Sequence, residues 1–199
     1  MLFRSNEGLA EVGFDQVIEC WSNIEIADGG WLATNSSSIG MKNLSSIIVY
    51  SDGRLSLYGY DGAMSRVRGR VPGERYSLSI LSGGTLDASF TIFEDLPEQG
   101  VYLAPGAVVN PFYSFTNCEF RNGTSGPTAL LTADNDQDIL IENAVFPANT
   151  WGGQYNVRKL VDAGSVTFLN ATGGFSGEAF ENDPFNRIFW NNVPVNLEV

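Results

Sequence analysis

The chain has no histidine, two cysteines and only two lysines among its 199 residues. Without histidine it can build neither a Ser-His nor a Cys-His catalytic system, and it offers no imidazole ligand to a metal. Two cysteines, Cys20 and Cys118, are too few for a disulfide-rich scaffold or a four-cysteine zinc site. Each missing residue type therefore excludes a large class of enzymes or metal proteins.

Positive charge is scarce as well. The chain has 11 Lys and Arg against 23 Asp and Glu, which gives a net charge of −12. Phosphate binding needs a basic surface, so we expect no nucleic-acid partner. No apolar run approaches the roughly 18 residues that cross a bilayer, so we expect no membrane insertion.

Strand and turn residues are abundant instead. The chain contains 22 glycines and 12% aromatic residues, whereas only 17% of its residues are charged. Short stretches of alternating apolar and polar residues recur between clusters of Gly, Asn, Asp and Pro, and no window sustains a helical spacing. This pattern predicts an all-β fold.

The alternating stretches form a repeat. In the middle of the chain, consecutive stretches begin 26 or 27 residues apart. The same register extends upstream and gives six units of about 27 residues. The first strand residue is apolar in every unit: Leu32, Leu55, Leu86, Tyr113, Ile139 and Val166.

Two further columns follow the repeat. The residue two places on is Thr34, Leu57, Ala88, Phe115, Ile141 and Phe168, and the residue six places before the first is Ile26, Val49, Ile80, Ala107, Ala133 and Leu160. Period-two alternation at a fixed repeat length is typical of a solenoid with one buried face per strand. We predict that these three columns form continuous stacks in its interior.

A column suited to a backbone bend follows the buried pair. It holds Asn117, Asn143 and Asn170, with Gly59 at the same position of an earlier unit. Asn and Gly enter left-handed backbone conformations at low cost, and stacked amides can hydrogen-bond along a ladder. We interpret the column as the bend ladder of a parallel β-helix, with glycosylation or ligand binding as the alternative.

With these features, residues 24–173 resemble the right-handed parallel β-helix family of pectate-lyase-like solenoids. The predicted fold is a right-handed, single-stranded parallel β-helix of about six coils, with residues 1–23 and 174–199 as end caps. The segment from Gly173 to Trp190 is similar to the stretch that follows β-helix regions in large type-IX-secreted surface proteins of gliding bacteria. That resemblance implies an extracellular or cell-surface segment of a larger protein.

The two cysteines should not be bonded to each other. Cys20 precedes the first unit and Cys118 follows the strand of the fourth. At least three rungs of about 4.8 Å then separate them, whereas a disulfide needs Cα atoms within about 7 Å. Cys118 shares its column with Thr91, Ala144 and Ala171, which predicts a small buried side chain.

Aromatic residues supply the first candidate binding surface. Trp31, Arg54, Tyr58 and Phe112 lie on the outward face of the repeated strand, on adjacent rungs. Aromatic rings on a flat ladder suit stacking against sugars, so polysaccharide is the candidate ligand. Burial under a loop or under another part of a larger polypeptide is the alternative.

Arginines supply the second candidate binding surface. Arg66, Arg68, Arg70 and Arg75 lie close together in a long unit, and we expect them on a protruding loop. Clustered arginines in an acidic protein could hold sulfate, acidic sugars or an acidic chain. A solvated loop without a ligand is the alternative.

Aspartates supply a third candidate site, for a metal ion. Asp134, Asp136 and Asp138 have the one-apart spacing of the first ligands of a calcium loop. An EF-hand would also need Gly and Glu where the chain has Ile139 and Val145. A calcium ion held together with main-chain carbonyls, and a solvated acidic turn, are the two interpretations.

Catalysis is disfavoured. Asp87 and Asp138 face outward two rungs apart, about 10 Å, beyond the roughly 5–9.5 Å that glycosidases use. Arg158 and Lys159 fall on a part of the coil that does not suit a lyase base. We expect a non-catalytic module, a rigid spacer or adhesive segment that contacts the rest of a larger polypeptide, cell-surface components or polysaccharide. A divergent polysaccharide lyase or hydrolase is the alternative.

Overall fold

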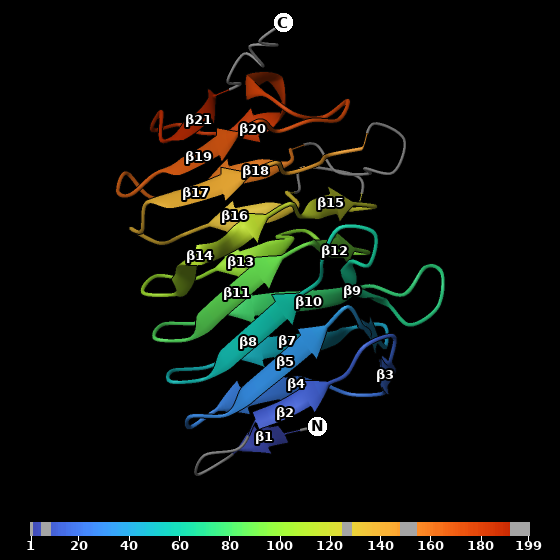
Figure 1. Cartoon of the computed structure of the whole chain (residues 1–199). Coiled ribbons are helices and arrows are strands. Elements are labelled where there is room, and N and C mark those ends of the chain that lie inside the picture. The colour runs from blue at the N-terminus through green and yellow to red at the C-terminus, as the bar shows by residue number, and fades with distance from the viewer. Residues whose placement is uncertain (1, 5–8, 125–128, 148–154, 192–199) are drawn as a thin grey trace, which may run out of the picture.

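The computed structural model describes residues 2–4, 9–124, 129–147 and 155–191 and is a parallel β-helix (Figure 1). Each coil passes through up to three strands before the chain rises to the next rung, from the N-terminus at the bottom of Figure 1 to the C-terminus at the top. All ladders between named strands are parallel. The predicted fold class is therefore confirmed, with about seven coils instead of six.

The first face of the solenoid is one sheet of eight strands. Their order is β1 (Leu2–Arg4), β4 (Ile24–Ala27), β7 (Ser45–Val49), β10 (Tyr76–Ile80), β13 (Val101–Leu103), β16 (Leu131–Ala133), β18 (Val157–Lys159) and β20 (Glu181–Asn182). A short 3₁₀ helix, η1 (Glu178–Phe180), leads into β20.

The second face points toward the viewer in Figure 1. It consists of β2 (Leu9–Val12), β5 (Trp31–Asn35), β8 (Arg54–Tyr58), β11 (Thr85–Ser89) and β14 (Val108–Thr116), and continues beside β14 with β17 (Ile139–Glu142), β19 (Val166–Leu169) and β21 (Ile188–Asn191). The third face consists of β3 (Val17–Cys20), β6 (Ser38–Met41), β9 (Ser65–Gly69), β12 (Thr91–Glu94) and β15 (Glu119–Arg121).

The additional coil comes from the N-terminal residues. β1, β2 and β3 pair in parallel with β4, β5 and β6, so much of the segment expected as a cap forms a rung of the solenoid. At the other end, β20 pairs with β18 and β21 pairs with β19. Trp190 of β21 stacks on Phe168 with ring centroids 4.1 Å apart. Both ends are thus extended by strands in register; residues 1, 5–8 and 192–199 of the predicted caps lie outside the described residues.

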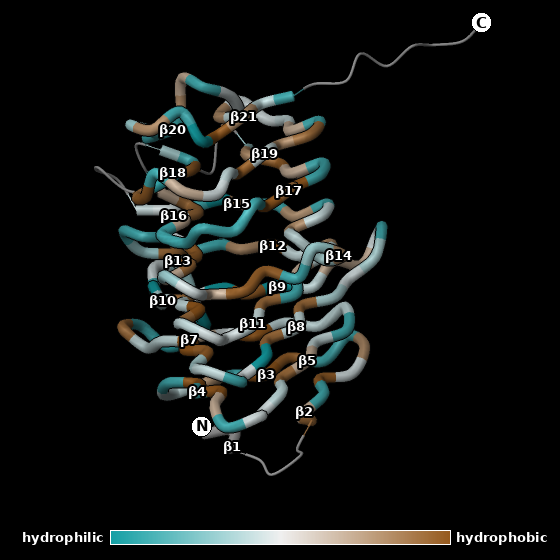
Figure 2. Tube along the Cα trace, turned by 90° about the vertical axis from the view of Figure 1, so that its left-hand side faces the viewer, coloured by the Kyte–Doolittle hydropathy of each residue, from teal (hydrophilic) through white to brown (hydrophobic). Residues whose placement is uncertain are grey.

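Apolar residues recur at the same positions of successive coils, as the brown segments of Figure 2 show. The column predicted two places after the strand start is interior throughout, with every member at most 1% exposed: Thr34, Leu57, Ala88, Phe115, Ile141 and Phe168. This column is confirmed.

The other two columns need three corrections. Leu86 pairs with Val109, which is fully buried, whereas Tyr113 is 42% exposed. In the remaining column, Leu103 takes the rung expected for Ala107, and Lys159 takes that expected for Leu160. Each error arises where the length of a turn or strand changes, because the sequence was aligned at a nearly constant repeat.

The bend ladder is confirmed at its three asparagines, whereas Gly59 does not adopt the left-handed conformation expected for it. Asn117, Asn143 and Asn170 have φ angles of 55°, 56° and 57°. The amide of Asn143 donates to Asn117 Oδ1 at 3.0 Å, and that of Asn170 donates to Asn143 Oδ1 at 3.5 Å. The asparagines therefore hold the corner of three consecutive coils both by backbone conformation and by side-chain hydrogen bonds.

Gly59 is required at its position by space. A Cβ atom there would lie 2.3 Å from the main-chain oxygen of Phe90 on the next coil. We expect Gly59→Ala to lower the free energy of unfolding by about 1–3 kcal/mol, measured by urea denaturation, since the backbone of two coils must separate. Gly13→Ala is the matched control, because nothing lies within 4 Å of its added Cβ; equal losses for both variants would contradict the packing argument.

The cysteines are free and buried. Cys20 ends β3 and Cys118 directly precedes β15, so four rungs of the third face separate them. Burial raises the pKa of the Cys118 thiol to about 12. The predicted absence of a disulfide is confirmed, and Cys118 is an unreactive core residue.

Candidate functional site

The candidate site lies on the outer side of the second face, across strands β5, β8 and β11. Strand pairing aligns Trp31 with Arg54, and Ser56 with Asp87, on neighbouring rungs. Alternation along each strand turns these side chains outward, opposite to the buried columns. We call Trp31, Arg54, Ser56, Tyr58 and Asp87 the Asp87 cluster.

One carboxylate oxygen organises the Asp87 cluster. Asp87 Oδ2 accepts hydrogen bonds from Arg54 Nε at 2.6 Å, Ser56 Oγ at 2.5 Å and Tyr58 OH at 3.0 Å. Trp31 Nε1 donates to Ser56 Oγ at 2.8 Å, and the Arg54 guanidinium lies 4.8 Å from the centre of the Trp31 ring. A cation–π contact and a chain of hydrogen bonds thus fix both the aromatic rings and the charges.

The Asp87 side chain is fully buried although it points away from the core. Burial by itself raises the pKa of Asp87, but the hydrogen bonds from Arg54 and Ser56 outweigh it, so that the pKa is lowered. The second oxygen, Oδ1, is buried and has no hydrogen-bond partner. Asp87 is therefore ionised at neutral pH, and its second oxygen is an acceptor without a hydrogen-bond partner beneath the surface.

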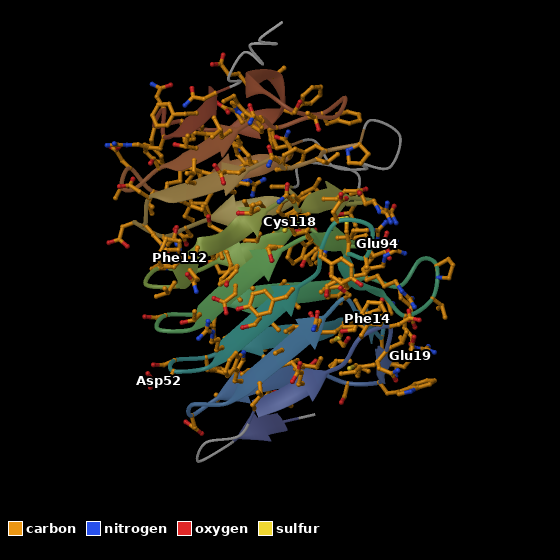
Figure 3. All side chains as sticks on the ribbon, viewed as in Figure 1. Phe14, Glu19, Asp52, Glu94, Phe112 and Cys118 are labelled. Carbon is orange, nitrogen blue, oxygen red and sulfur yellow. The ribbon has the colours of Figure 1, made fainter. Side chains whose placement is uncertain are left out.

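Strand β14 bulges next to the Asp87 cluster. Its pairing with β11 shifts register twice, and the extra residues carry Phe112, 83% exposed, and Tyr113. Tyr113 meets Tyr58 edge to face, with ring centroids 5.0 Å apart. In Figure 3, Phe112 lies at the left edge of the second face. The bulge therefore extends the aromatic surface by one rung, and the four residues predicted for sugar contact lie on one face.

A glutamine side chain forms the hydrogen bonds that a neighbouring strand would otherwise make with the main chain next to this bulge. Gln137, in the turn before β17, accepts a hydrogen bond from Val109 N at 2.8 Å and donates to Val109 O at 2.5 Å. The amide thereby replaces a neighbouring peptide group. The sequence pattern did not indicate this role.

The four clustered arginines are elsewhere. Arg66 and Arg68 lie in β9 on the third face, so the expected protruding loop holds only Arg70 and Arg75. All four have an acidic partner: Arg66 with Glu94 at 3.4 Å, Arg68 with Glu19 at 3.5 Å, Arg70 with Glu74 at 3.0 Å and Arg75 with Asp95 at 3.8 Å. Figure 3 shows Glu19 and Glu94 on the opposite side from Phe112.

These ion pairs belong to a charge ladder. Arg121 of β15 also pairs with Glu94, at 2.9 Å, and Arg70 lies over the Trp21 ring at 4.0 Å. The arginines therefore neutralise acidic side chains, most of them on other rungs of the third face. Sequence spacing placed them together, but it gave no indication of the partners Glu19, Glu94 and Asp95, which come from other coils; only Glu74 lies in the same turn as Arg70.

The acidic run lies in the turn between β16 and β17. Asp134 accepts a hydrogen bond from Tyr102 OH at 2.9 Å, and Asp138 accepts one from Ser165 at 2.7 Å, whereas Asp136 is exposed. Within the described residues, no three acidic or cysteine side chains converge as metal ligands. A bound calcium ion there stays a prediction.

Lys159 is a group that the sequence interpretation missed. Its side chain lies inside the solenoid with no exposed surface, and Nζ donates a hydrogen bond to the main-chain oxygen of Asn135. Burial lowers the pKa of Lys159, although Asp134 and its acidic neighbours partly offset this. Its place in a column of aliphatic residues was the available signal, hidden by a shift of one position.

Comparison of the chain with protein-family models, with curated proteins and with solved structures gave no match. No helix in the described part of the chain has the length and apolar character needed to span a membrane.

Proposed function

We propose that this chain is a rigid, non-catalytic solenoid module that contacts glycans through the second face. The observation that carries the proposal is the exposed aromatic surface, Tyr113 and Phe112 of the bulge beside Tyr58, built onto the Asp87 cluster. Ring faces stack on the apolar faces of sugars, while neighbouring polar groups bind hydroxyls. A β-helix holds such groups on consecutive rungs at about 4.8 Å spacing.

Charge favours a neutral glycan. The net charge of −12 repels polyuronates, and Arg54 is already paired with Asp87. Neutral polysaccharides are therefore the preferred ligand class.

The resemblance to pectate-lyase-like β-helices and to type-IX-secreted surface proteins supports a setting for this module. We place it in a larger exported or cell-surface bacterial protein, where it acts as a spacer or adhesive segment. The alternative is a divergent lyase or hydrolase. It needs a second carboxylate or a base near Asp87, and Asp138 lies two rungs away, before β17.

The test is affinity electrophoresis of the chain in gels that contain neutral polysaccharides or polyuronates. We expect a neutral polysaccharide to retard migration, and Phe112→Ala to weaken binding about three- to tenfold, the effect of one stacked ring. Leu44→Ala is the control, since Leu44 is equally exposed at 88% but lies in the turn before β7.

Equal binding by the two variants would disprove the assignment to this face, and no retardation by any polysaccharide would disprove glycan contact. Release of new reducing ends or of unsaturated products from the same polymers would favour the enzyme instead.

A further inference from the structure

A polar pair interrupts the apolar interior between the sixth and seventh coils. Lys159 of β18 is fully buried, and Asn135, in the turn after β16, is 1% exposed. Ala133 of β16 pairs with Lys159, which brings the turn against the lysine side chain. Nζ donates to the main-chain oxygen of Asn135. Of the two lysines in the chain, Lys42 is exposed and Lys159 is enclosed.

The side chain of Asn135 is close to this amine and incompletely bonded. Nζ is hydrogen-bonded to the main-chain oxygen of the residue that carries this carboxamide, and that oxygen and Cγ are each two bonds from the same Cα. Asn135 Nδ2 donates to Ala107 O at 3.3 Å, but Oδ1 is buried without a partner. A buried carbonyl oxygen without a donor is unusual and calls for an explanation.

The surroundings favour a free amine. Burial lowers the pKa of Lys159, so that more of the unprotonated, nucleophilic form is present than at the surface. Asp134, Asp136, Asp138 and Asp183 oppose this effect by stabilising the ammonium. Asp134 directly precedes Asn135 in the chain, is half-buried and lines the same surface groove, so we assign it as the proton acceptor.

We propose that Lys159 and Asn135 form an intramolecular isopeptide bond. Unprotonated Nζ attacks Cγ of Asn135, and the Nζ–Cγ amide bond forms as the Cγ–Nδ2 bond breaks. The Asp134 carboxylate accepts the proton released by the amine and returns it to Nδ2, which leaves as ammonia. The step is a transamidation: nothing is oxidised or reduced, and no co-reactant is needed.

The bond would join neighbouring coils covalently. It closes a loop between residues 24 positions apart, from the turn after β16 to β18. A cross-link of this kind opposes separation of the two rungs. It also replaces a buried amine, which can take up a proton, by an amide that stays neutral.

The mass of the intact, denatured protein tests the proposal. We expect the unaltered full-length chain, incubated folded at neutral pH, to weigh less than its sequence by one ammonia molecule. Trypsin should then yield peptides 122–158 and 159–187 joined through Lys159. Asn135→Asp should lose one water molecule instead, since the leaving oxygen differs, and Lys159→Met should keep its sequence mass.

Two further measurements complete the design. Amine-reactive labelling in denaturant should modify Lys42 but not Lys159 in the unaltered chain. Asp134→Asn should slow the mass loss at least tenfold if Asp134 carries the proton. A folded, unaltered chain that retains its full sequence mass, with Lys159 labelled in denaturant, would overturn the proposal whatever the variants do.

Discussion

Replacing Phe120 by alanine should lower the free energy of unfolding by about 3–5 kcal/mol, the usual effect of removing a buried aromatic ring. Phe120 is fully buried in β15, and its ring stacks on Phe93 at 5.3 Å and on Phe146 at 5.4 Å. These rings belong to three consecutive coils. Alanine would leave a cavity that rigid neighbouring rungs cannot collapse to fill.

Urea denaturation followed by tryptophan fluorescence measures this loss. Phe112→Ala is the matched control, because the Phe112 ring is 83% exposed and its removal should change stability by less than about 0.5 kcal/mol. If Phe120→Ala does not accumulate as folded protein, Phe120→Leu gives a smaller loss that can be measured. Equal stability of Phe120→Ala and Phe112→Ala would contradict the aromatic stack.

The second large effect is expected for Asp87→Asn, at about 1–3 kcal/mol. The substitution keeps the shape of the side chain but leaves Arg54 without its counter-charge. The new amide group also brings N–H donors next to Arg54 and Ser56, which are themselves donors to this side chain. We expect less than the roughly 3–5 kcal/mol typical of a broken, fully buried ion pair, because the Arg54 side chain is 38% exposed and screened by water. Asp52→Asn, at an exposed turn, is the control.

The effect of Asp87 should depend on pH in a defined direction. Its folded-state pKa is lowered, so its contribution is complete above the unfolded value of about 3.9 and is lost as the pH falls through the folded pKa. The stability difference between the unaltered chain and Asp87→Asn should be constant from about pH 8 to about pH 5 and shrink below about pH 4. A difference that grows on acidification would refute the ionised state of Asp87.

Local patterns predicted the parts of this fold that local physics controls. Alternation assigned strands to the second face, and the asparagine column marked a corner, because Asn117 and Asn143 adopt positive φ angles at low cost whatever the rest of the coil does. Compact residues in the column of Cys118 likewise indicated a tight interior position. These inferences need only the residue and its neighbours along the chain.

The candidate site was predictable in its aromatic part only. Trp31 and Tyr58 were identified because their outward positions follow from the repeat. Phe112 is exposed for a different reason, since it lies in the bulge of β14 and Val108 takes the position expected for it. Asp87 had the same sequence signal as a solvated aspartate. Its burial depends on three donors from β8 converging on one oxygen, and spacing along the chain does not contain that information.

Tertiary pairing decided the remaining features. Val109 rather than Tyr113 enters the core because the bulge of β14 shifts its alternation, and Gln137 completes the ladder from another coil. Lys159 rather than Leu160 faces inward because β18 pairs with β16 in that register. In a parallel β-helix the sequence alone determines which residues of a strand alternate between its two sides. Hydrogen bonds between rungs determine which of these two sets of side chains faces the interior, because a shift of one residue in the pairing turns every side chain to the opposite side.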